Sequence, residues 1–187
     1  MTFILKEIII TLRKTTLVIV KIQMKYLIAL GSNLGDRKNN INQAISKISD
    51  FAIVEAVSSI YETKALLPEG APVTWAENFY NSAILITAKP SFTAHELLQR
   101  LKQIETEMGR PQIYKKWAPR IIDLDIIIGP EDVSTEGLIV PHPQLAMRDF
   151  VLIPCREIAH DYYIKSLGKK FEELDVEHLE KNVIRKV

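Results

Sequence analysis

The chain has 187 residues, with 24 Lys and Arg against 23 Asp and Glu and a formal net charge of +1. This balance argues against a general nucleic-acid coat or a polybasic membrane-binding protein. Apolar residues make up 47% of the chain, which is long enough to bury a core without disulfides. The single cysteine, Cys155, excludes an internal disulfide, and its apolar neighbours predict a buried small residue rather than a nucleophile.

Residues 1–23 are predicted to be an appendage to one domain formed by residues 24–187. This segment is apolar and basic, but Lys6, Arg13 and Lys14 interrupt it. It therefore lacks the continuous apolar stretch of a secretory signal or a membrane-spanning helix. A strong strand pattern follows Met24 directly, and we hypothesise that the true start lies there. We expect a cytoplasmic protein with no membrane partner.

The remaining pattern predicts six core elements. Asp36 is placed to cap the first helix, and Ser91 or Thr93 to open the second. Apolar residues recur every three or four positions in both helices. The elements are strand 26–30, helix 37–49, strand 51–60, strand 79–88, a helix to about Met108 and strand 121–128.

The order β-α-β-β-α-β is that of the ferredoxin-like fold, an α+β arrangement with a mainly antiparallel sheet. Both helices should cover one face of the sheet. The additional C-terminal elements should cover the other face, or that face should hold a site. Those elements are predicted as a strand at 138–140, a helical run at 145–158 and a short helix at 171–174. Two long loops, 61–77 and 109–120, are candidates for function because of their length.

Asp123 and Asp125 alternate with apolar residues in the last core strand. Because successive side chains of a strand point to opposite faces, both carboxylates should share one face, with Cα atoms about 6.5–7 Å apart. Such a pair is tolerated when it is exposed, when one carboxyl is protonated, or when a divalent cation lies between them. Two carboxylates with substrate phosphates suit Mg²⁺, whereas a solvated strand end is the simpler alternative.

The loop before this strand is basic. It holds Arg110, Lys115, Lys116 and Arg120 and no acidic residue. Cations beside a two-carboxylate metal site suit phosphoryl transfer, because they stabilise charge on the transferred and leaving groups. Residues 31–35 lack the lysine and the glycine spacing of a phosphate-binding loop, so a tight turn is the favoured interpretation there.

Single residues elsewhere are weaker candidates. Asn81 lies in mid-strand, where a structural asparagine is uncommon, and its amide can pair with the edge of a heterocycle. His142 lies between two prolines that fix its backbone, which favours a site over a simple turn. Phe79 and Phe150 suit stacking on a flat ring or a place in the core equally well. Trp117 could cover a ligand or anchor the basic loop.

Five segments occur in a familiar order and spacing between about residues 25 and 160. They are Ala29-Leu-Gly-Ser-Asn-Leu-Gly35, Tyr80-Asn-Ser-Ala83, Glu105 with Gly109-Arg110, Trp117-Ala-Pro-Arg-Ile-Ile-Asp-Leu-Asp125 and Val140-Pro-His142. In these segments the chain resembles the 6-hydroxymethyl-7,8-dihydropterin pyrophosphokinase family of folate biosynthesis. The resemblance implies transfer of the terminal two phosphates of ATP to the hydroxymethyl group of a reduced pterin, giving AMP.

The resemblance also implies roles for individual residues. Asp123 and Asp125 would hold two Mg²⁺ ions, and Arg110 and Arg120 would complete the catalytic set by stabilising the transition state. The ATP contacts would be Arg110, Lys116, Arg120, His142 and Arg148. The pterin contacts would be Thr63, Phe79, Asn81, Trp117 and Phe150. The implied partners are these two small molecules, with no nucleic acid, and we expect a monomer.

Departures from the family pattern leave alternatives open. Gln112 stands where the family often has a second arginine, so one phosphate contact is lost or is supplied by Lys115 or Lys116. Ala118 replaces the usual glycine. A nucleotidyltransferase on the same fold would release pyrophosphate instead of AMP. A nucleic-acid-binding module would need exposed aromatic rings and a basic face, and the acidic strand argues against it.

Overall fold

The computed structural model describes residues 7–11, 17–21, 24–89, 92–111 and 115–187. Its strands are β1 (Glu7–Thr11), β2 (Leu17–Lys21), β3 (Met24–Ser32), β4 (Ala52–Val57), β5 (Tyr61–Thr63), β6 (Phe79–Ala88), β7 (Asp123–Ile128), β8 (Val133–Thr135), β9 (Leu138–Val140), β10 (Tyr163–Ile164), β11 (Lys169–Lys170) and β12 (Val183–Lys186). Its helices are α1 (Arg37–Ser49), α2 (Ala94–Glu107) and α3 (Asp149–Ala159), with short 3₁₀ helices η1 (Val73–Trp75), η2 (Leu145–Met147) and η3 (Phe171–Glu173).

An antiparallel sheet forms the centre of the molecule. Its four core strands lie in the order β4, β6, β3, β7, and every neighbouring pair is antiparallel. Strands β3 and β4 therefore run in the same direction with β6 between them, which is the split βαβ arrangement. The predicted ferredoxin-like core with a mainly antiparallel sheet is confirmed.

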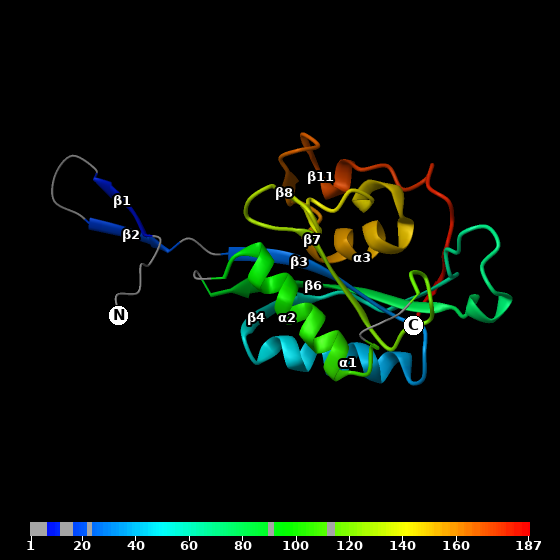
Figure 1. The fold of residues 1–187 in the computed structure, drawn as a ribbon. Helices are drawn as coiled ribbons and strands as arrows, with labels where there is room; N and C mark the ends of the chain where they lie inside the picture. Colours follow the sequence, from blue (N-terminus) through cyan, green and yellow to red (C-terminus); the bar gives the residue numbers. More distant parts are fainter. Residues whose placement is uncertain (1–6, 12–16, 22–23, 90–91, 112–114) are drawn as a thin grey trace.

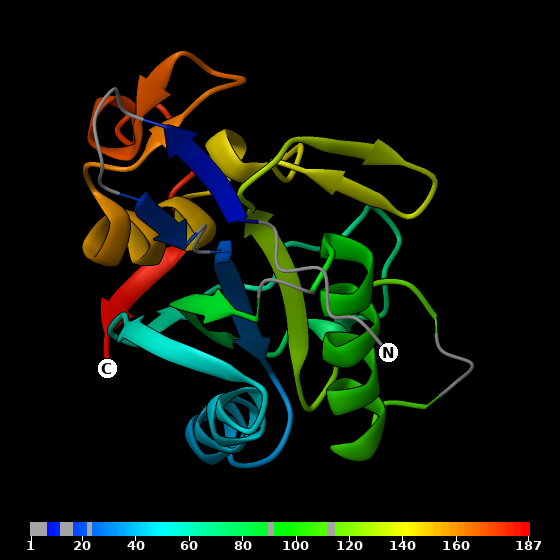
Figure 2. The same cartoon turned by 90° about the vertical axis from the view of Figure 1, so that its left-hand side faces the viewer.

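Helices α1 and α2 cover one face of the sheet and α3 lies on the other, as Figures 1 and 2 show. The alternation of β3 sorts its side chains between the two layers. Tyr26, Ile28 and Leu30 are buried in the core beneath α1 and α2, whereas Leu27 belongs to the core beneath α3. The second face serves both predicted purposes, because α3 covers part of it and the candidate site described below takes another part.

The predicted helix ends are confirmed by their hydrogen bonds. The Asp36 carboxylate accepts the Asn39 backbone N–H at 3.0 Å. Thr93 and Glu96 form a reciprocal capping box at the start of α2. Gly109, with φ of 106°, follows the end of α2 in the left-handed conformation that favours glycine. Ser91, the other predicted start, lies outside the described residues.

Several elements differ from the sequence expectation. The predicted loop 61–77 begins with β5, which pairs with both β6 and β12. Strand β12 itself was not predicted, because it is short and three of its four residues are exposed. The expected helical run 145–158 is divided into η2 and α3, with Arg148 in an extended conformation between them. The short helix expected at 171–174 is η3.

Strands β1 and β2 pair only with each other among the described strands. In Figure 1 this hairpin lies beyond the start of β3 and away from the sheet. We therefore propose that residues 24–187 form the domain and that the segment before them is an appendage. No helix in the described ranges combines the length and apolar character needed to cross a membrane. Cys155 is fully buried as predicted, and burial raises the pKa of its thiol.

Glu157 fastens α3 to the β4–β5 connection and to β12. Its carboxylate accepts the Ser59 N–H at 3.0 Å, the Ser59 hydroxyl at 2.6 Å and the Tyr61 hydroxyl at 2.9 Å. The Lys186 Nζ lies 3.1 Å from the same carboxylate. Burial raises the pKa of Glu157, but the hydrogen bonds from Ser59, Lys186 and Tyr61 outweigh burial and bring it to about 2.

The substitution Glu157→Gln should lower the free energy of unfolding by about 2 kcal/mol at pH 7, because the hydrogen bonds to a charged acceptor are lost. The folded-state pKa lies below the ordinary value of 4.5, so this contribution is present above pH 4.5 and is lost as the pH falls toward 2. Urea unfolding at several pH values would measure the difference from wild type. A difference that stays constant down to pH 2 would contradict the assignment.

Candidate active site

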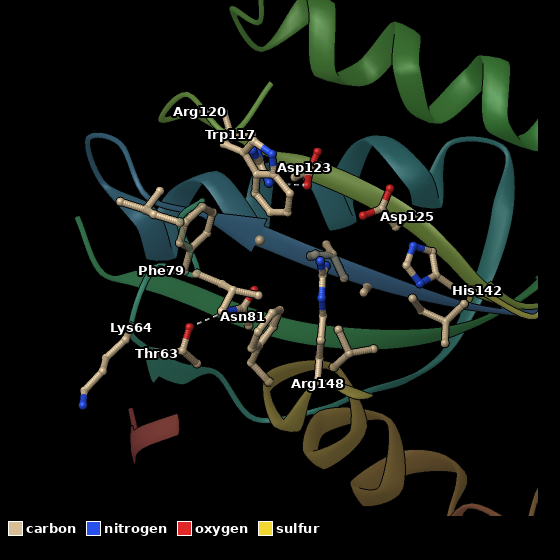
Figure 3. A pocket seen from close by; sticks show the side chains of 18 residues that line it. Thr63, Lys64, Phe79, Asn81, Trp117, Arg120, Asp123, Asp125, His142 and Arg148 are labelled. Carbon is tan, nitrogen blue, oxygen red and sulfur yellow. Dashed lines mark hydrogen bonds and ion pairs between the residues drawn. The ribbon is translucent and has the colours of Figure 1, made fainter. Parts of the chain in front are cut away.

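A cleft lined by both polar and aromatic side chains opens on the α3 face of the sheet (Figure 3). It lies between β7, neighbouring parts of β3 and β6, and the start of α3. Ten of the predicted site residues line it: Thr63, Phe79, Asn81, Trp117, Arg120, Asp123, Asp125, His142, Arg148 and Phe150. The other two, Arg110 and Lys116, are not among the residues that line it.

Asp123 and Asp125 line the cleft from the same face of β7, while Leu124 and Ile126 are buried in the core on the opposite face. On the neighbouring strand β3, Gly31 lies opposite Asp123 and Ala29 lies opposite Asp125. Because both neighbours are small, the floor of the cleft beside the two carboxylates stays open. The predicted shared face is confirmed.

Two arginines hold Asp123. Arg110 Nη1 donates to its Oδ1 at 2.8 Å, and Arg120 Nη2 lies 2.8 Å from its Oδ2. Burial raises the pKa of Asp123, but the charges of Arg120, Lys102 and Arg110 outweigh burial and leave the pKa below its ordinary value. Asp123 is therefore an ionised carboxylate.

Asp125 is held more loosely. Its side chain is 45% exposed, against 19% for Asp123, and its ion pair with Lys102 Nζ is longer, at 3.8 Å. The surrounding cleft walls displace part of the water around it, and this loss of solvation and the neighbouring Asp123 carboxylate raise its pKa, against the opposing charges of Lys102 and His142. A cation bound between the two carboxylates would relieve this repulsion.

Glu105 of α2 holds Arg110 and β7 in place from behind. The side chain is 1% exposed, and its Oε2 accepts Arg110 Nη1 at 2.5 Å. Its Oε1 accepts Lys102 Nζ and the Leu124 backbone N–H, both at 2.7 Å. Arg110 thus bridges Glu105 and Asp123, so its contribution to the site is made from beneath the cleft floor.

The turn after β3 positions Arg120. Asn33 Oδ1 accepts the Arg120 backbone N–H at 2.7 Å, and the Asn33 N–H donates to the Arg120 carbonyl at 3.2 Å. Asn40 of α1 donates to the Ser32 hydroxyl and the Leu34 carbonyl, which anchors the turn to the helix. The tight turn predicted for residues 31–35 therefore also fixes the end of the basic loop.

Asn81 and Thr63 form the opposite wall. Asn81 Nδ2 donates to Thr63 Oγ1 at 2.7 Å, which orients the amide, and Figure 3 draws this bond. A Cβ atom on Gly31 would lie 2.9 Å from Asn81 Oδ1 and 3.6 Å from Phe79. Gly31 therefore leaves the space that Asn81 and Phe79 occupy.

His142, Arg148 and Trp117 enclose the remaining side. His142 Nδ1 accepts the Gln144 N–H at 3.2 Å, so the proton of the neutral ring is on Nε2. Burial lowers the pKa of His142 despite the nearby Asp125 carboxylate. Arg148 lies 5.9 Å from the Trp117 ring, and Lys116 Nζ lies 5.5 Å from the same ring. Lys116 thus contacts Trp117, which lines the cleft.

Comparison with known proteins identifies the family of this chain. The family model described as 7,8-dihydro-6-hydroxymethylpterin-pyrophosphokinase (HPPK) matches residues 27–160. The chain belongs to this family. Two relatives are named 2-amino-4-hydroxy-6-hydroxymethyldihydropteridine pyrophosphokinase. The Aquifex aeolicus protein is 41% identical over 150 residues, covering 78% of this chain and 88% of the relative. The Bacillus subtilis protein is 44% identical over 136 residues, which cover 70% of this chain and 75% of the relative.

Solved structures extend the comparison to the HPPK fold. A Plasmodium falciparum HPPK-DHPS triple mutant with pteroate matches with a TM-score of 0.60 at 13% identity. The match covers 81% of this chain but 42% of the solved one, so this chain spans less than half of that protein. A likeness at this identity shows the fold alone. The resemblance inferred from the sequence motifs is confirmed by the family match.

Sequence reasoning gave no role to several residues of this HPPK-family site. Glu105 was part of a matching motif, and its position four residues after Leu101 on the apolar stripe of α2 was a signal of a buried carboxylate. Gly31 was also part of a matching motif, whereas Lys102 carried no comparable signal. Their roles depend on neighbours that only the folded chain brings together.

The substitution Glu105→Gln should lower the free energy of unfolding by about 3 kcal/mol, because it breaks a buried ion pair. The matched control is Glu107→Gln on the same helix. Glu107 pairs with Lys47 at the surface and is 45% exposed, so its loss should cost far less. Chemical denaturation of both variants measures the two costs. Equal costs would contradict the role of Glu105.

Proposed function

We propose that this chain transfers the terminal diphosphate of ATP to the hydroxymethyl group of 6-hydroxymethyl-7,8-dihydropterin, with release of AMP. In this reaction the hydroxymethyl oxygen bonds to the β-phosphorus of ATP. The bond from that phosphorus to the oxygen shared with the α-phosphate breaks, and the hydroxyl proton is lost. The observation that carries the proposal is that paired carboxylates, arginines and an oriented amide line a single cleft. Family membership supports the same reaction.

Asp123 and Asp125 are the proposed ligands of two Mg²⁺ ions. The chemistry of the donors fits, because both are carboxylates and both open into the cleft. The described residues contain no group of three or more His, Cys, Asp or Glu that could hold a metal. A site with two protein carboxylates therefore suits Mg²⁺ that also binds substrate phosphates and water. Bound Mg²⁺ supplies neutralisation of phosphate charge and lowers the pKa of a coordinated hydroxyl.

Arg110 and Arg120 are proposed to stabilise the phosphate charge, Arg120 as a contact from within the cleft and Arg110 from beneath the cleft floor through Asp123. Their positive charge is held in place by Glu105 and Asp123, so little reorganisation is needed when charge moves toward the leaving AMP. The Nε–H of Arg120 is buried and has no hydrogen-bond partner among the described residues.

His142, Arg148 and Lys116 are proposed to complete the ATP side. His142 can donate from Nε2 into the cleft, because its Nδ1 is occupied by Gln144. Arg148 adds a guanidinium from the start of α3. Lys116 lies against the outer loop at Trp117 and supplies charge near the entrance.

The pterin is proposed to bind between Phe79 and Phe150, with its amide-like edge against Asn81. Thr63 fixes the orientation of the Asn81 amide, and the amide oxygen lies beside Gly31, which also lines the cleft. Aromatic rings on a flat heterocycle favour offset stacking. Trp117 lines the same cleft and would cover the bound ligands.

Incubation with ATP, Mg²⁺ and the reduced pterin should yield AMP and the pterin diphosphate in equal amounts. Liquid chromatography with mass spectrometry identifies both products, and omission of the pterin is the control. Release of free pyrophosphate with a nucleotidylated product would instead indicate a nucleotidyltransferase. ADP as the nucleotide product would contradict both reactions.

The substitutions Asp123→Asn and Asp125→Asn should each lower kcat by a factor on the order of 100 or more, because a carboxylate that neutralises developing charge is lost. Excess Mg²⁺ should restore part of the rate of the Asp125 variant, since its binding of the metal is weakened rather than abolished. Asp132→Asn, an exposed acid outside the cleft, is the control. Near-wild-type turnover in either site variant would refute the metal role.

A further inference from the structure

Asp149 is the first residue of α3 and lies between Arg148 and Phe150, both of which line the cleft. Its side chain does not line the cleft and the residue is 3% exposed. Oδ1 accepts the Phe150 N–H at 2.7 Å, and Oδ2 accepts the N–H groups of Asn182 at 2.7 Å and Val183 at 2.8 Å. One buried carboxylate thus joins the start of α3 to the C-terminal segment.

The C-terminal segment in turn joins the opposite wall. The Lys64 N–H donates to the Asn182 carbonyl at 2.9 Å, and Val183 pairs with Thr63. Thr63 is the residue that orients Asn81. A continuous path of bonds therefore runs from Asn81 through Thr63 and the C-terminal segment to Asp149 and Phe150.

Further contacts fasten the same segment along its length. Arg185 Nε and Nη2 each lie 2.8 Å from Glu62 Oε2. Arg37 lies 3.4 Å from the other Glu62 oxygen and donates to the Asn78 carbonyl at 2.8 Å, directly before Phe79. Hydrogen bonds and ion pairs therefore join residues 182–186 to both walls of the cleft.

We propose that Asp149 is a positioning residue for the pterin, and that residues 182–186 form a strap that sets the separation of the Asn81 and Phe150 walls. This inference rests on the proposed function. A carboxylate suits the position because both of its oxygens accept hydrogen bonds, which three backbone N–H groups require here. Buried donors left without an acceptor are costly, so the bonds restrict the walls to one arrangement.

The direct test is Asp149→Asn, which keeps the shape of the side chain. It replaces one of the two acceptor oxygens with an NH₂ group, which cannot accept a hydrogen bond from the backbone N–H groups there. We expect the KM for the pterin to rise about tenfold or more, because small displacements of positioning groups are costly. The KM for ATP should change little, since the carboxylates and most cations of the ATP side come from β7 and the loops beside it. Val183→Pro removes the Val183 N–H that donates to Asp149 Oδ2. It should likewise raise the KM for the pterin and leave the KM for ATP nearly unchanged.

Two controls separate positioning from general stability. Ile48→Val removes a buried methyl group from the core beneath α1, on the sheet face away from the cleft, so it should lower the Tm without raising the KM for the pterin. Asn182→Ala removes only a side-chain bond to the Glu180 carbonyl and keeps the backbone groups that bind Asp149 and Lys64. It should behave as wild type.

Hydrogen exchange of the wild-type chain gives a measurement that does not depend on a variant folding. Pterin binding should slow exchange of the amides of residues 182–186, because both walls become fixed. Unchanged exchange there, or a Tm loss in Asp149→Asn with an unchanged KM for the pterin, would overturn the inference. These results presuppose AMP formation by the wild type. Absence of that activity would instead overturn the proposed function.

Discussion

The mutual repulsion of Asp123 and Asp125 is the constraint on which the site depends. Strand geometry places both carboxylates on one face of β7, and the cleft walls reduce the solvation that would screen their repulsion. The chain offsets this cost with cations, two of them on Asp123 and one more distant from Asp125. The arrangement leaves Asp125 the less satisfied of the pair, and that imbalance favours a bound divalent cation.

The arginines that pair with Asp123 are in turn positioned by residues of the elements packed around β7. Glu105 reaches through from α2 to fix Arg110, while Asn33 fixes the backbone of Arg120. On the other side of the cleft, α3 presents Arg148 and Phe150, and its own position is fixed by Asp149 and Glu157. The sheet thus supplies the charged floor, and elements distant in sequence supply the walls.

The sequence predicted those features whose causes are local. Asp36 and Thr93 mark helix starts because a cap bonds within three residues, and the alternation around Leu124 assigns both aspartates to one face. The pairing of β5 with β12 could not be predicted, because it joins short polar strands about 120 residues apart. The role of Asp149 was equally inaccessible, since its partners in residues 182–183 are backbone N–H groups that any residue except proline provides.

The most direct test of the central claim is to count the divalent ions that the paired carboxylates bind. Electron paramagnetic resonance with Mn²⁺ and a non-hydrolysable ATP analogue gives the number of ions held per chain. The account predicts two ions for the wild type and a clear loss of bound Mn²⁺ in a variant with both Asp123→Asn and Asp125→Asn. The same number of ions and the same Mn²⁺ affinity in that double variant would contradict it.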